Sequence, residues 1–60
     1  MFEKDIKRIK ACMEYKDYYS ALQYASIMKE NYKDKERVYL EEIIKDIKEG
    51  DYNKIRNRLG

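Results

Sequence analysis

Histidine, proline, threonine and tryptophan are all missing from this chain, and it holds only two glycines and a single cysteine, Cys12. Without histidine, the usual base that activates a catalytic nucleophile is lacking. One cysteine cannot form an internal disulfide, and a zinc site needs more Cys or His ligands than the chain offers. We therefore expect no enzyme activity, no cofactor and no metal. An inert, buried thiol in a reducing compartment is the simplest interpretation, which predicts a cytoplasmic protein.

Long apolar runs are also absent, so we expect no membrane-spanning segment. The first ten residues mix both charge signs and lack the apolar stretch of a secretory signal. The net charge of +2 is too small to indicate nucleic-acid binding by itself. The abundance of Lys, Ile, Tyr and Asn is typical of AT-rich genomes, those of some phages included.

What the chain does contain is helical spacing of apolar residues. The first predicted helix covers residues 2–14, and the second follows an N-cap at Asp17 and runs to about residue 32. Asp34 is the predicted cap of a third helix over residues 35–49. The predicted inner stripes of these helices are Phe2, Ile6, Ile9 and Met13; then Tyr18, Ala21, Leu22, Ala25, Met28 and Tyr32; then Leu40, Ile43, Ile44 and Ile47.

A fourth, shorter helix is predicted at the end of the chain. Gly50 suits the left-handed residue that ends a helix, and Asp51 follows it as a new N-cap. Sixty residues allow only one small domain, residues 1–60. We predict an all-α fold of three or four short helices, arranged as an antiparallel bundle or as an array of helical hairpins.

Two short segments repeat at a spacing of thirty-four residues. KDYYSA at 16–21 aligns with GDYNKI at 50–55, which pairs Asp17 with Asp51 and Tyr18 with Tyr52. This spacing and the acid–tyrosine pair resemble the start of the second helix of a tetratricopeptide repeat. The resemblance implies a protein-binding groove formed by helices. The chain departs from the repeat at residues 43 and 46, where a small residue and a tyrosine are usual, and an up-and-down bundle is the alternative.

The seven tyrosines indicate a contact surface. Tyrosine combines a large rigid ring with a hydroxyl that tolerates water, and it is enriched in binding hot spots. A chain this small lacks the room to bury every bulky side chain, so self-association or a larger protein partner is expected. The predicted contact residues lie off the inner stripes and are Tyr19, Tyr24, Ile27, Val38 and Tyr39.

Three acidic residues, Glu42, Asp46 and Glu49, share one face of the third predicted helix. Carboxylates in such a group can bind a hard cation, but Lys45 and Lys48 are interleaved with them, which favours a solvated face. We interpret the three acids as the polar rim of the contact surface. The predicted function is a non-catalytic protein–protein interaction module that acts as a regulator, adaptor or inhibitor.

The end of the chain supports an alternative. Residues 52–60 contain three basic residues, Lys54, Arg56 and Arg58, and no acid, whereas residues 41–51 contain five acids and two bases. Arginine and lysine side chains neutralise phosphates, and arginine also reads base edges. The alternative prediction is therefore a small DNA- or RNA-binding regulator that uses these three residues.

Overall fold

The computed structural model describes residues 1–59, which form four α-helices and contain no β-strand. This architecture confirms the all-α fold predicted from the spacing of apolar residues. A 3₁₀ turn, η1, follows the second helix. The elements are α1 (Phe2–Glu14), α2 (Tyr18–Met28), η1 (Lys29–Asn31), α3 (Asp34–Glu49) and α4 (Tyr52–Leu59).

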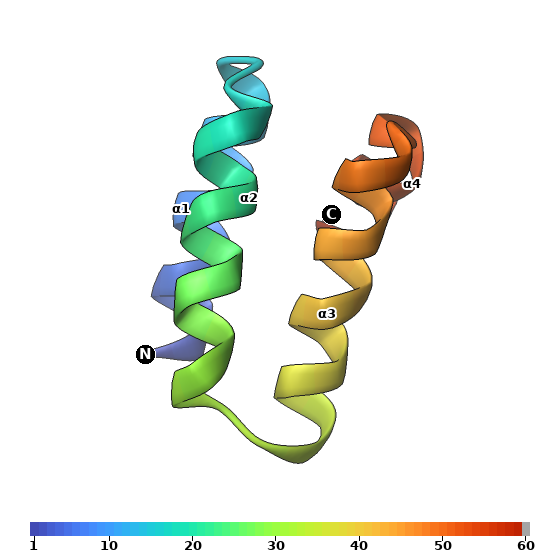
Figure 1. The fold of residues 1–60 in the computed structure, drawn as a ribbon. Coiled ribbons are helices and arrows are strands. Elements are labelled where there is room, and N and C mark those ends of the chain that lie inside the picture. The colour runs from blue at the N-terminus through green and yellow to red at the C-terminus, as the bar shows by residue number, and fades with distance from the viewer. Residues whose placement is uncertain (60) are drawn as a thin grey trace.

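Consecutive helices run in opposite directions, and the last one closes the bundle (Figure 1). Each helix packs against the next along the chain, and α4 also contacts α1. The contacts thus fit the antiparallel bundle, the first of the two predicted arrangements.

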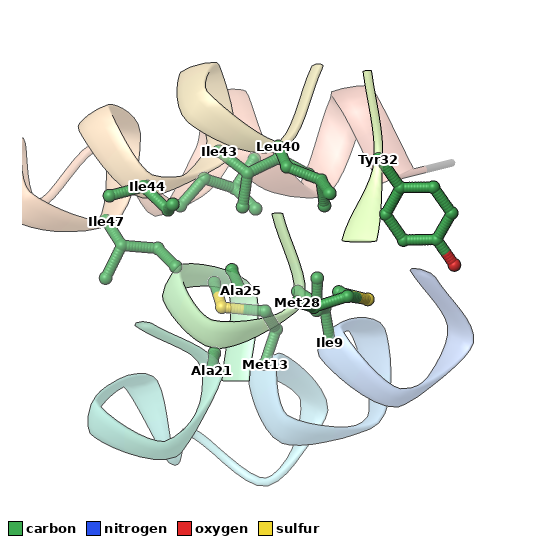
Figure 2. Close-up of a cluster of buried hydrophobic side chains, with 11 residues drawn as sticks. Ile9, Met13, Ala21, Ala25, Met28, Tyr32, Leu40, Ile43, Ile44 and Ile47 are labelled. Atoms are coloured by element: carbon green, nitrogen blue, oxygen red, sulfur yellow. The ribbon is translucent and has the colours of Figure 1, made fainter. Parts of the chain in front are cut away.

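The core lies between α3 and the pair formed by α1 and α2 (Figure 2). Ile9 of α1 and Leu40 and Ile43 of α3 are completely buried. Burial of each such side chain contributes about 1.5–3 kcal/mol relative to an exposed one. Ala21 and Ala25 of α2 are equally inaccessible, and their small side chains let the neighbouring helices approach closely. With this side of α2 in the core, its opposite side faces solvent.

The turns α1–α2 and α3–α4 share one backbone conformation. A residue with positive φ ends each first helix, Lys16 at 60° and Gly50 at 77°. The following amides, of Asp17 and Asp51, donate to carbonyls five residues earlier at 2.8 and 3.0 Å. This is the Schellman arrangement, in which the left-handed residue costs glycine little and other residues more. The predicted role of Gly50 is confirmed, and Lys16 holds the same position without glycine's freedom.

The two aspartates also begin the second helix of each pair in the same way. Each side chain accepts a hydrogen bond at 3.2 Å from the backbone N–H three residues ahead, which confirms the predicted caps at Asp17 and Asp51. The next residues, Tyr18 and Tyr52, stack on each other with ring centroids 3.8 Å apart and planes 5° from parallel. The repeated segments therefore meet in space and hold the start of α4 against the start of α2.

Two predictions fail between α2 and α3. The second helix ends at Met28 and η1, and Tyr32, expected within it, has an extended backbone although its ring is buried. In that conformation the Tyr32 hydroxyl reaches a carboxylate on α1. Asp34 does not cap the third helix: it is the first residue of α3, with φ of 56°, and no side-chain bond caps that end.

The left-handed Lys16 gives a test of the turn. Lys16→Gly should raise the free energy of unfolding by about 0.5–1 kcal/mol, because glycine relieves the steric strain of positive φ by more than it adds to the entropy of the unfolded chain. Urea denaturation would measure the change. Gly50→Ala is the matched control and should lower stability through φ strain alone, since a Cβ there would meet open space. Unchanged or lower stability in Lys16→Gly would contradict the argument.

Candidate functional site

None of the eleven residues of α2 is charged, in a chain with 14 Lys or Arg and 12 Asp or Glu residues. Ala21, Ala25 and Met28 occupy its buried side. On the opposite side Tyr19, Gln23 and Ile27 follow one another at i, i+4 and i+8 and are all exposed. We call these three residues the α2 outer face.

The apolar members of the α2 outer face are far more exposed than large apolar residues of a core. Tyr19 retains 73% and Ile27 70% of their accessible area. Covering them removes apolar surface from water, which contributes about 25 cal/mol for each Å². No charge on α2 has to be desolvated at the same time, and the centres of protein interfaces are likewise depleted in charged residues. Chemically, this surface is suited to contact with another apolar surface.

Tyr24, predicted as a contact residue, is instead half-buried at the edge of α2 that faces α1. Its hydroxyl donates to Oδ1 of Asp5 at 2.6 Å, and the guanidinium of Arg8 lies 5.3 Å from the centre of its ring. The hydroxyl of Tyr32 donates to Oδ2 of the same carboxylate. One acidic side chain thus joins α1 to α2 and to the segment after η1.

Electrostatics follow from these two hydrogen bonds. The bond from Tyr24, then that from Tyr32, lowers the pKa of Asp5, because both stabilise the carboxylate. The pKa of Tyr32 is raised to about 12 by its hydrogen bond to Asp5, together with burial. Both shifts favour a charged Asp5 between neutral tyrosines. Asp5 therefore stabilises the fold above the ordinary carboxyl pKa, and this contribution is lost as pH falls through its lower folded value.

Asp5→Asn should lower the free energy of unfolding at pH 7 by about 2 kcal/mol, since two charge-assisted hydrogen bonds are weakened. The variant should also lose part of the acid-induced drop in stability that the unchanged chain shows below about pH 4. Denaturation in urea between pH 2 and 7 would measure both effects. Asp34→Asn, at an exposed position, controls for the loss of one negative charge. Equal pH profiles for the Asp5→Asn variant and the unchanged chain would contradict this assignment.

An internal ion pair involves residues that had been predicted to lie at contact surfaces. Asp46, expected on an acidic rim, is only 3% exposed, and its Oδ2 lies 3.3 Å from Nη2 of Arg58. Arg58 also pairs with Glu42. The pairing draws Asp46 inward, because α4 packs over this side of α3. The predicted rim thus retains only Glu42 and Glu49 at the surface.

Among the three residues of the predicted nucleic-acid site, Arg58 makes the most contacts within the protein. Its side chain is 22% exposed, and its guanidinium lies 5.9 Å from the ring centre of Tyr39. The Tyr39 hydroxyl donates to the Arg58 carbonyl at 2.9 Å. Lys54 and Arg56 remain exposed. The three basic side chains therefore do not form one free cationic surface.

Removing one partner of the Asp46–Arg58 pair should be costlier than removing both. Arg58→Leu leaves the Asp46 carboxylate buried without its counterion and should destabilise the fold by about 2–3 kcal/mol. Replacing both residues with leucine should recover at least half of that loss, because no buried charge remains and the buried, unpaired Nε of Arg58 is removed as well. Thermal unfolding of the two single variants and the double variant would measure the coupling. Additive losses would show that the two side chains act independently.

The remaining predicted contact residues lie on α3. Val38 is 52% exposed and Tyr39 is half-buried, and both line a shallow depression together with Glu42. Charged residues surround Val38 on this face, unlike the apolar residues of the α2 outer face. The structure brings Tyr19 and Ile27 together on one helix and places Val38 and Tyr39 on another.

Two exposed residues escaped the sequence analysis. Gln23 completes the α2 outer face, and the uncharged run from residue 18 to residue 28 is the signal that could have revealed it. Tyr15, in the turn before α2, is 85% exposed and had no periodic pattern to reveal it. Cys12, predicted to be buried, is half-buried against the core.

Other kinds of site find little support in the described part of the chain. Within residues 1–59 no group of three or more Cys, Asp or Glu side chains is arranged to hold a metal ion. No helix in that range has the length and apolar character needed to cross a bilayer. Comparison of the chain with protein-family models, curated proteins and solved structures finds no match. The tetratricopeptide-like repeat therefore stays a prediction.

Proposed function

We propose that this protein is a non-catalytic interaction module that binds another protein surface through the α2 outer face. One observation carries the proposal: Tyr19 and Ile27 stand exposed on a helix with no charged residue. A surface of this kind gains apolar contact on binding at a low cost in desolvation. A role as regulator, adaptor or inhibitor would follow from occupying the partner's surface.

The rigid support of the face adds to the proposal. Ala21 and Ala25 hold α2 in the core, and the Tyr24–Asp5 bond fixes its edge against α1. Side chains on a supported helix lose less freedom on binding than those of a mobile loop. Tyr19 also has only two side-chain torsions to immobilise, which is one reason for the enrichment of tyrosine in binding sites.

The nucleic-acid alternative has weaker support. Arg58 is held by Glu42 and Asp46, which leaves Lys54 and Arg56 as the exposed cations of the predicted site. The acidic residues of the adjacent α3 surface would also repel phosphates. A steep loss of affinity with added salt would be needed to revive this alternative.

Site-specific photocrosslinking tests the proposed face. A benzophenone amino acid in place of Gln23 should form adducts with a bound protein in cells, whereas the same probe in place of exposed Lys45 on α3 should form few. Tyr19→Ser with Ile27→Ser should reduce the adducts of the Gln23 probe at least tenfold, because the apolar contact is lost.

Circular dichroism of the double variant supplies the control for folding. Its helical signal should stay unchanged, because both side chains are exposed. Adducts at position 45 as abundant as those at position 23, or no effect of the two serines, would overturn the proposal. Val38→Ser matches the loss of an exposed apolar side chain on another helix and should leave the adducts intact.

A further inference from the structure

The residues around Gln23 have the same chemical character when read in either direction. Ser20 and Ser26 stand three positions away on the two sides, and Tyr19 and Ile27 stand four positions away. Leu22 and Tyr24 flank Gln23 at half-buried positions, and the symmetric Ala21 and Ala25 point into the core. The exposed surface of α2 is therefore close to symmetric about its central residue.

We propose that the occupant of the α2 outer face is a second copy of this chain, with the two α2 helices packed antiparallel about Gln23. This inference rests on the proposed function and names the partner. A two-fold axis through the contact would place the Gln23 amides of the two copies opposite each other, where each can donate and accept. Tyr19 of one copy then faces Ile27 of the other, about 6 Å to either side of the axis, from the 1.5 Å rise per residue.

Charges at the ends of α2 match this arrangement. Lys16 and Glu30, seven positions from Gln23 on either side, are both exposed and opposite in sign. Antiparallel packing brings Lys16 of each copy near Glu30 of the other, so two oppositely charged pairs border the uncharged centre.

The alternatives fit these charges less well. Parallel packing of the two helices would set Lys16 beside Lys16 and Glu30 beside Glu30, which repel. Antiparallel packing also sets the positive end of each helix dipole beside the negative end of the other. Within one chain Glu30 already pairs with Arg37, with 3.3 Å between Oε2 and Nη2. The Glu30 side chain nevertheless stays 62% exposed and can bind a second cation.

Cysteine crosslinking tests the register. In a Cys12→Ser background, Gln23→Cys should form an interchain disulfide under mild oxidation, because the residue lies on the two-fold axis. Tyr19→Cys alone should crosslink poorly to itself, whereas a mixture of Tyr19→Cys and Ile27→Cys chains should crosslink efficiently. Lys45→Cys, on the outer side of α3, is the control and should not crosslink.

Charge reversal tests the ends of the contact. Sedimentation equilibrium should show a dimer of the unchanged chain, with a dissociation constant raised about fivefold to tenfold by Lys16→Glu, since two border pairs become repulsive. Adding Glu30→Lys should restore the original value by exchanging the charges of each pair. Equal dissociation constants for all three proteins, or efficient crosslinking through position 45, would overturn the antiparallel arrangement.

The two proposals can fail separately. A monomeric chain whose Gln23 probe forms adducts with a different protein would overturn the dimer and leave the proposed function standing. A monomeric chain with no adduct at position 23 would overturn both. Adducts of twice the chain's mass, lost in the Tyr19→Ser and Ile27→Ser variant, would support both.

Discussion

The packing of Ala21 and Ala25 into the core is the constraint on which the rest of the structure depends. A helix buried through small residues lies close to its neighbours, and its rotation about its own axis is thereby set. Because α2 contains no charged residue, this rotation leaves only uncharged side chains on the outer side of the helix. The exposed Tyr19 and Ile27 are a consequence of how the core is built, as well as the basis of the proposed contact.

Most local features of the fold could be predicted from the sequence, except the end of α2 and the start of α3, and distant contacts could not. Apolar spacing and the caps at Asp17 and Asp51 depend on residues within a turn or two of each other, so both can be recognised in the sequence alone. The bond from Tyr24 to Asp5 joins residues nineteen positions apart, and that from Arg58 to Asp46 spans twelve. Polar residues that pair across helices look like surface residues until the helices are placed, which is why Tyr24 and Asp46 were assigned to the contact surface.

The two segments that repeat at a spacing of thirty-four residues have a structural role whether or not the chain belongs to a repeat family. Both copies encode a left-handed helix end, an aspartate cap and a tyrosine, and both turns adopt the same conformation. The stacked rings of Tyr18 and Tyr52 then bring the two turns together at one end of the bundle. The repeated segments thus help to close the bundle, in which α4 packs against α1.

A small domain gives self-association a role in stability as well as in function. A chain of this size has little core to oppose the loss of conformational entropy. Each apolar side chain that stays exposed in an isolated protomer contributes no burial free energy to its stability. Covering the α2 outer face with a second copy would recover part of it and would make stability depend on protein concentration. The central position of Gln23 fits this arrangement, because a polar residue on the axis specifies register where two purely apolar faces could slide along each other.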